Sequence, residues 1–439
     1  MNFKLVIFMT GMILGIGTWL QAAEEVVRGI TLERCIQTAL EASPDVQSAN
    51  ARLSASSAAV KEASSAYYPQ VGLSGSWTRT DNPPQAFFMS LNQRRASLQK
   101  DFNHPDDTEN VRGSVAAQWR VFDSGRREAD RKAARQGAKA SEFMLESVQN
   151  DLVYQITRAY YGILQVRAFV AVQEEAVESL SESLRVATER NLAGSDMKTD
   201  VLNLDVQLSQ AREELIRAKN GLKLGVAALN TAIGRTLIGP ADVVDMKGGE
   251  VPAASTNEVN GGVEERPELR AMEARVRAME AMVARARREY LPVVNGMGSF
   301  DWDSETLSGF EQSYLVGVAV EVNIFDGQRN RAGVTKARAA AAEIQAEAEK
   351  LRQTLELDLT QARLNEQEAR ERLEVAAKSQ TSAEEALRIT QERYQQGAAV
   401  ITELLTAQIG LTATRTRQVA AQYDCLIARA NVERAMGRK

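Results

Sequence analysis

The residues that could carry out chemistry are few and widely separated. His104 is the only histidine, and Asp106 and Asp107 follow it in a stretch rich in turn residues. An imidazole and two carboxylates can bind a metal ion, but a lone histidine in a polar loop rarely does so. The sequence contains no glycine-rich phosphate loop and no Cys/His metal spacing. Chemistry by a pair of acids stays open, but no pattern indicates it, so we predict no metal, no cofactor and no enzymatic activity.

The two cysteines, Cys35 and Cys425, lie near opposite ends of the chain. A disulfide between them is possible in an oxidising compartment, but cysteine is also a common small apolar core residue. We expect two buried free thiols. The formal net charge of −5 gives no reason to expect nucleic acid as a partner.

Residues 1–23 are typical of a secretory signal peptide, because Lys4 is followed by an apolar run and then by small residues. An uncleaved anchor helix is the alternative. The apolar run is at the short end for a membrane span, and acidic Glu24 and Glu25 follow directly, so cleavage near Ala22 or Ala23 is favoured. We predict that the protein is exported.

One long stretch of the chain occurs twice. A shift of 203 residues superimposes Phe122-Asp123 on Phe325-Asp326 and Gly194 on Gly397, whereas upstream prolines match at a shift of 223. The two shifts differ by 20, so the first copy contains about 20 extra residues, placed in a loop within 80–110. We predict two structural repeats, joined by a linker or equatorial segment, with these bounds: 24–234 for the first repeat, 235–262 for the linker and 263–439 for the second repeat.

Each repeat contains two runs in which apolar residues alternate with polar or small ones. The runs cover about 70–79, 111–122, 293–302 and 313–325. Runs of about 9–11 residues with one apolar face are typical of outer-membrane strands, although a soluble sheet has the same period. Aromatic residues gather at or near the ends of these runs, as in an interfacial girdle: Tyr67, Tyr68, Trp77, Trp119, Tyr290, Trp302 and Tyr314.

Long helices are predicted around these strands. Residues 31–66 form a helix with Thr31 as N-cap, and residues 125–193 contain no proline and span on the order of 100 Å as a helix. Apolar residues at spacings of three and four predict an antiparallel coiled coil. Gly194 and Gly397 are C-cap glycines, after which return helices at 198–234 and 400–437 complete two helical hairpins.

Four strands cannot close a transmembrane barrel, because the smallest barrels have about eight. An open sheet edge in lipid costs several kcal/mol for each unpaired backbone group. Strands that span a membrane here must therefore be pooled from several chains, and a dimer, a trimer and a tetramer all satisfy this arithmetic.

The repeats, the Phe-Asp turns and the Gly-x5-Asp/Glu spacing at the hairpin tips resemble the TolC-like outer-membrane efflux family. The resemblance implies a mainly α fold with transmembrane β structure. A homotrimer would pool its strands into one twelve-stranded outer-membrane β-barrel, and the helical hairpins would continue it as a periplasmic α-barrel. It also implies a passive exit duct of a tripartite efflux or type I secretion system in a Gram-negative bacterium. The expected partners are outer-membrane lipid, a periplasmic adaptor and an inner-membrane transporter.

The resemblance extends to single residues at the hairpin tips. The family's Tyr–Asp clasp, which helps to hold the tip closed, corresponds to Tyr394 and Asp200. Glu403 occupies the first acidic position of the second tip, Thr406 replaces the second acid, and Ala399 replaces an arginine that supports the clasp. A solvated acid that complements the helix dipole is the alternative for both carboxylates. The tips at which an adaptor would dock are marked by Gly194, Thr199, Gly397 and Thr402.

A periplasmic adaptor-like or coiled-coil scaffold protein of an export complex is the main alternative function. Such an adaptor has a signal peptide, a long hairpin and β structure, but one hairpin rather than two copies in register. It also lacks pairs of strands capped by aromatic residues, so an outer-membrane duct is favoured.

Overall fold

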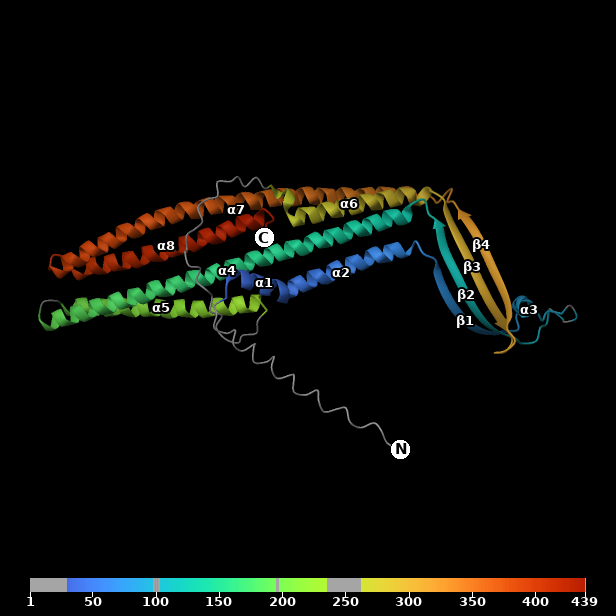
Figure 1. Ribbon diagram of the computed structural model, residues 1–439, viewed down its shortest axis with the longest axis horizontal. Helices are drawn as coiled ribbons and strands as arrows, with labels where there is room; N and C mark the ends of the chain where they lie inside the picture. Colours follow the sequence, from blue (N-terminus) through green and yellow to red (C-terminus); the bar gives the residue numbers. More distant parts are fainter. Residues whose placement is uncertain are drawn as a thin grey trace, which may run out of the picture. The chain divides into compact units, whose positions relative to one another are not determined.

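The computed structural model describes residues 30–97, 99, 101, 103–194, 197–234 and 262–438 (Figure 1). The predicted signal peptide and nearly all of the predicted segment 235–262 lie outside these residues. The chain divides into two compact units, each with parts of both predicted repeats. The helical unit is drawn from Met1–Ala49, Leu145–Pro267 and Arg352–Lys439, and the sheet unit comprises Asn50–Met144 and Glu268–Leu351. Within the described ranges, no helix combines the length and the apolar character needed to cross a membrane.

Two helical hairpins make up nearly half of the chain. The helices α4 (Arg126–Leu192) and α5 (Lys198–Ala232) form the first, and α7 (Arg329–Gln395) and α8 (Ile401–Ala435) form the second. Gly194 and Gly397 follow the long helices with φ of 80° and 74°, a left-handed conformation that favours glycine. The two predicted C-cap glycines are therefore confirmed.

A repeated aspartate starts each long helix. Asp123 Oδ2 accepts a hydrogen bond from the Arg127 amide at 2.8 Å, and Asp326 Oδ2 accepts one from the Asn330 amide at 2.9 Å. The carboxylates thus satisfy amide groups of the first helical turn that have no partner within the helix. This explains in physical terms why the Phe-Asp turn recurs in the sequence.

The predicted single helix over 31–66 is wrong, because the chain forms α1 (Leu32–Ala42) and α2 (Pro44–Ser65) there. Ser43 separates the two helices in an extended conformation, as expected for a residue that precedes proline. The predicted N-cap is correct, since the Arg34 amide donates to Thr31 Oγ1 at 3.4 Å.

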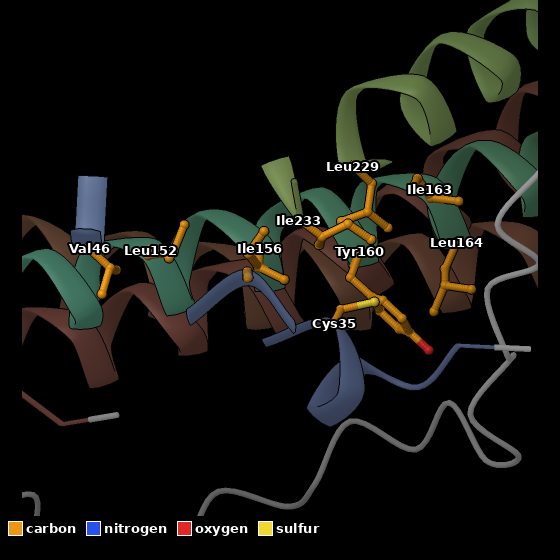
Figure 2. Close-up of a cluster of buried hydrophobic side chains, with 10 residues drawn as sticks. Cys35, Val46, Leu152, Ile156, Tyr160, Ile163, Leu164, Leu229 and Ile233 are labelled. Carbon is orange, nitrogen blue, oxygen red and sulfur yellow. The ribbon is translucent and has the colours of Figure 1, made fainter. Parts of the chain in front are cut away.

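The core of the helical unit contains a cluster of buried apolar side chains from α1, α2, α4, α5 and Ile233, the residue that follows α5 (Figure 2). Tyr160 and Ile156 are fully buried there, and the Tyr160 hydroxyl donates to the Ile30 carbonyl at 3.3 Å. Cys35 lies in the same cluster, whereas Cys425 is buried in α8. Both cysteines are thiols rather than halves of a disulfide, as predicted, and burial raises the pKa of Cys425.

The sheet unit contains an antiparallel sheet with the strand order β1-β2-β3-β4 (Figure 1). The predicted strand positions agree with those observed to within about three residues, except at the end of the last strand. The predicted end at 325 is wrong, because β4 ends at Glu321, which pairs with Val293, the first residue of β3. Pro292 precedes that residue, so the chain beyond Glu321 has no neighbouring strand to pair with. The strands are β1 (Gln70–Thr80), β2 (Thr108–Phe122), β3 (Val293–Ser304) and β4 (Glu311–Glu321).

The connection between β1 and β2 is not the irregular loop that the turn residues predict, because it contains the helix α3 (Pro83–Asn92). Asn82 is its N-cap and accepts from the Gln85 amide at 3.4 Å, and the two prolines occupy the first turn, where proline is tolerated. The connection between β3 and β4 is short, as predicted. The helix α6 (Pro267–Arg287) leads into β3, with the short 3-10 helices η2 (Val263–Glu265) before it and η3 (Arg288–Tyr290) after it.

Candidate functional site

One face of the sheet is apolar over most of its length. The register places Trp77 opposite Val111, Val115 opposite Phe300, and Phe300 opposite Tyr314. Leu73, Tyr314 and Val316 on this face are 81%, 79% and 79% exposed within the single chain. A continuous apolar surface of this kind requires a cover, either lipid or another protein. The large side chains that share this face are Val71, Leu73, Trp77, Val111, Val115, Trp119, Phe300, Trp302, Tyr314, Val316, Val318 and Val320.

The opposite face of the sheet is polar. Serine and threonine occupy every second position of β1 from Ser74 to Thr80. Charged side chains of β2 and β3 lie on the same face. Arg112 Nη2 lies 3.1 Å from Asp301 Oδ1, and the Asn110 side chain donates to Asp303 Oδ1 at 2.7 Å. A sheet with one apolar face, which can contact lipid, and one polar face, which can contact water, is suited to the wall of a pore.

The predicted girdle residues fall at the two ends of the sheet. Trp77, Trp302 and Tyr314 lie in strand segments next to the β1–β2 and β3–β4 connections. The other four lie at the end next to the helices: Tyr67, Tyr68, Trp119 and Tyr290. Trp119 Nε1 donates to the Tyr67 carbonyl at 3.0 Å, and the Arg127 guanidinium lies 4.7 Å from the Tyr67 ring centroid. Both belts of aromatic side chains are therefore present, and their contact with a membrane interface stays a prediction.

Among the described residues, β1 and β4 have one neighbouring strand each, so both edges of the sheet are unpaired there. The backbone groups along these edges have no strand partner. The sheet is therefore open on both sides in a way that a neighbouring copy could complete.

The predicted gate residue Tyr394 belongs to a buried cluster that joins the two hairpins near their tips. It is only 9% exposed and packs in a cluster with Leu204 of the first hairpin and Leu404 of the second. In the part of the chain that the structure describes, its buried members are Leu180, Ala187, Leu204, Leu208, Tyr394, Ile401, Leu404 and Leu405. The helices α4, α5, α7 and α8 thus share one small core at this end.

Arg190 connects the same two hairpins by polar contacts. Its guanidinium carbon lies 5.0 Å from the centre of the Tyr394 ring. Its two terminal nitrogens donate to the carbonyl oxygens of Tyr394 at 3.4 Å and Gln395 at 3.3 Å. These carbonyls are at the C-terminal end of α7, where they have no partner within the helix and where a cation is favoured.

The acidic and threonine residues predicted for the tips differ in exposure and in the contacts that they make. Glu403 is exposed, and its carboxylate lies 3.5 Å from Arg393 Nη1. Asp200 is half-buried in the first turn of α5, and across the described residues its carboxylate makes no hydrogen bond or ion pair. Thr406 donates to the Thr402 carbonyl within α8 at 2.8 Å, and Thr199 is exposed beside Gly194 in the first tip. The predicted clasp, in which Tyr394 and Asp200 would join neighbouring helix pairs, stays a prediction.

The only histidine lies at the surface. His104 Nδ1 is 3.1 Å from Asp101 Oδ2, and both side chains are exposed. Asp107, which follows in the sequence, pairs with Arg79 instead. In the ranges that the structure describes, no three His, Cys, Asp or Glu side chains are grouped as metal ligands.

Comparisons with known proteins identify this arrangement. A family model described as outer membrane efflux protein matches residues 35–235 and 263–438. The chain belongs to the outer membrane efflux protein family. Protein CyaE of Bordetella pertussis is 26% identical over 403 residues, which cover 89% of this chain and 80% of that protein. Outer membrane protein OprJ of Pseudomonas aeruginosa is 25% identical over 313 residues, which cover 70% of this chain and 65% of OprJ, just under two thirds.

Solved structures show the same fold. The outer-membrane channel OprN matches with a TM-score of 0.80 at 19% identity, over 93% of this chain and 90% of that one. The MtrE outer membrane channel of Neisseria gonorrhoeae, solved in its open state, matches with a TM-score of 0.77 at 17% identity, over 93% and 89% of the two chains. The predicted family, the mainly helical fold with its few strands, the outer-membrane location and the role as an efflux channel are thereby confirmed.

Sequence reasoning missed the most connected residue of the tips. The Glu-Arg pairs at 189–190 and 392–393 mark the repeat in the sequence, but that pattern does not indicate what the arginines contact. Only the folded chain brings Arg190 of one hairpin to Tyr394 of the other.

Proposed function

We propose that this outer membrane efflux protein is a passive exit duct built from three copies of the chain. The observation that carries the proposal is the four-stranded sheet with one apolar face and two unpaired edges. In lipid, each unpaired edge group costs several kcal/mol, so the sheet requires closure. Three copies would supply twelve strands, above the minimum of about eight, and a trimer is the assembly that the family resemblance implies.

The helical hairpins would extend from this barrel into the periplasm, with their tips directed at a periplasmic adaptor. Residues beside the tip glycines support this assignment, because Leu192, Met197 and Val400 are 83%, 73% and 60% exposed. Large apolar side chains held in water at the end of a long hairpin are typical of a protein-binding surface. The adaptor would contact the tips around Gly194, Thr199, Gly397 and Thr402, and would couple the duct to an inner-membrane transporter.

The tips would also form the closed end of the duct. Tyr394 and Asp200 would clasp neighbouring helix pairs, and Glu403 would contribute one acidic group from each copy to the constriction. Thr406 would leave the second acidic position of the family uncharged. The cluster around Tyr394 supports this role, because a buried link between two hairpins resists their separation.

The chain would conduct its cargo without catalysing a reaction. Similar proteins are named for different cargo, such as the antibiotic efflux pump outer membrane protein ArpC and the pyoverdine export outer membrane protein OpmQ. We therefore assign substrate choice to the inner-membrane transporter, with the duct as a common exit.

Single-channel recording in planar bilayers tests this function. The protein is expected to insert and to conduct ions in discrete steps of low conductance, because the proposed clasp would hold the tips closed. Tyr394→Phe and Asp200→Ala are each expected to raise the conductance, because each removes one side of the clasp. If both variants conduct as the parent does, the clasp assignment is wrong, and if no preparation conducts, the duct itself is wrong.

A further inference from the structure

The helix α3 in the connection between β1 and β2 is the largest feature that the duct function leaves unexplained. It lies beside the end of the sheet that is remote from α2 (Figure 1). The corresponding connection in the second repeat has no such helix, since it spans only 305–310. The extra residues of the first repeat therefore form a folded element with a definite position.

Contacts at the C-terminal end of α3 show which face of the sheet it covers. The Gln93 side chain donates to the Asn110 side chain at 2.9 Å and to the Glu109 carbonyl at 2.7 Å. Asn110 in turn donates to Asp303. Gln93, Asn110 and Asp303 are 5%, 6% and 1% exposed, so these polar groups are buried beneath the helix end.

Asn110 and Asp303 both belong to the polar face of the sheet, as their register with Thr78 and Arg112 shows. In the proposed barrel the apolar face meets lipid and the polar face lines the pore. The helix α3 is therefore held on the pore side of the wall.

Two arginines after the helix fasten it to the other half of the sheet. Arg94 pairs with Glu311 at 3.4 Å and donates to the Gln312 carbonyl at 3.2 Å, and Arg95 pairs with Glu305. Glu311 lies opposite Asp303 and thus also on the polar face. Arg94 has a φ of 53°, an uncommon left-handed conformation for a residue other than glycine, so the chain turns sharply to make these contacts.

The dimensions of the proposed barrel bring three such helices together. Twelve strands about 4.8 Å apart and tilted by roughly 40° enclose a radius of about 12 Å. A helix with its side chains is about 10–12 Å across, so three helices on the inner wall would reach the pore axis. Phe88 and Leu91 of α3 are 62% and 44% exposed and have room for neighbours of the same kind.

We propose that the three copies of α3 pack against one another through Phe88 and Leu91 and form an apolar gate at the outer mouth of the duct. Apolar constrictions exclude water and ions even where they leave a narrow opening. The contacts of Gln93, Arg94 and Arg95 with the sheet form a latch that holds each helix inward. The ion pairs of Arg94 and Arg95 are exposed and therefore weak, so this part of the latch can release when cargo arrives from the periplasmic side. This inference rests on the proposed trimeric duct.

Access from outside the cell tests the gate independently of the hairpin tips. The test places one cysteine at Ser74, on the pore-facing side of β1, and measures its labelling in intact cells by a bulky membrane-impermeant maleimide. Leu307→Cys, in the exposed β3–β4 connection, is the matched control that reports on surface display. Leu73→Cys, on the apolar face, is the control for lipid-facing positions, and native Cys35 and Cys425 are buried.

With the latch intact, Ser74→Cys is expected to react at least tenfold more slowly than Leu307→Cys. Adding Arg94→Ala and Arg95→Ala is expected to raise the labelling rate of Ser74→Cys at least tenfold and to leave the labelling rate of Leu307→Cys unchanged. Phe88→Cys is expected to form disulfide-linked dimers on mild oxidation, because three such side chains meet at the axis. Rapid labelling of Ser74→Cys with the latch intact, or no response to its removal, would overturn the gate alone. Failure to label Leu307→Cys from outside would overturn the proposed duct and the gate together.

Discussion

Arg190 and Arg393 occupy the same position in the two hairpins, 203 residues apart, yet they make different contacts. Arg190 reaches the other hairpin, where it stacks on Tyr394 and donates to two carbonyl oxygens at the end of α7. Arg393 stays within its own hairpin, where it pairs with exposed Glu403 and donates to the Ala398 carbonyl at 3.1 Å. The equivalent residues therefore act between hairpins in one case and within a hairpin in the other.

The difference arises from the residue that follows each arginine. Tyr394 follows Arg393, whereas Asn191 follows Arg190, so only the second hairpin has an aromatic ring to place between the two. A buried ring can hold a guanidinium by stacking and exclude water from its hydrogen bonds. A duplicated sequence thus produces one link across the hairpins rather than two equal ones.

Removing the ring should have the largest effect. Tyr394→Ala takes a large side chain out of the shared cluster and removes the stacking surface for Arg190. Truncation of a buried aromatic side chain costs roughly 3–5 kcal/mol, so amide hydrogen exchange near both tips should accelerate on the order of 100-fold or more. Unchanged exchange in the tip of the first hairpin would show that the cluster does not join the two hairpins.

Replacing the arginines should have a smaller effect than removing the ring. Arg190→Ala should weaken the tips by about 2 kcal/mol, because it removes a stack and charge-assisted hydrogen bonds. Arg393→Ala is the matched control and should cost under about 1 kcal/mol, since it breaks an exposed ion pair. Hydrogen exchange on both variants measures the difference, and Arg190→Lys should fall between them because lysine keeps the charge but lacks the planar group. If Arg190→Ala and Arg393→Ala accelerated hydrogen exchange equally, the proposed difference between the two arginines would be wrong.

A smaller, pH-dependent effect is expected where α7 and α8 meet the segment before α6. Asp358 lies 2.6 Å from Arg266 Nη1 and 3.0 Å from Arg434 Nη2. Burial alone would raise the pKa of Asp358, but hydrogen bonds and charge from Arg266 and Arg434 outweigh it and hold the pKa below its usual range. The resulting stabilisation is present above the ordinary aspartate pKa of about 4 and is lost as the pH falls through the lowered value.

Thermal unfolding between neutral and acidic pH measures this dependence. Asp358→Asn should lower the stability at neutral pH and flatten the acidic limb of the profile. Glu403→Gln, which removes one exposed ion pair from the tip, is the control and should change the stability at neutral pH much less. A profile for Asp358→Asn parallel to that of the parent would contradict the assignment of the acid sensitivity to this carboxylate.

Regular patterns in the sequence account for most of the fold. Alternation in segments such as Val71–Trp77 specifies which strand face is apolar, and the glycines at 194 and 397 specify where each hairpin turns, because these are local properties of the backbone. The family resemblance then supplied the tip residues, of which Tyr394 is the one that the structure places in a buried cluster.

Features that depend on distant contacts or on ambiguous turn residues could not be predicted. Asn82 and the two following prolines are equally compatible with a loop and with the capped start of α3, and the contacts of Gln93 with β2 decide between them. The partner of Arg190 lies more than 200 residues away, so no local spacing reveals it. The end of α1 at Ser43 is a local effect of Pro44. It is not predicted, because the residues on both sides have a helical pattern.

The central claim, that three chains pool their strands into one duct, is tested most directly by the mass of the particle in detergent. The protein would be extracted from washed outer membranes and its mass measured after subtraction of bound detergent. A stable particle of three chains is the predicted result, because the sheet of one chain has two unpaired edges. A soluble monomer or dimer in the periplasmic extract would contradict the account and would make the sheet an ordinary soluble one.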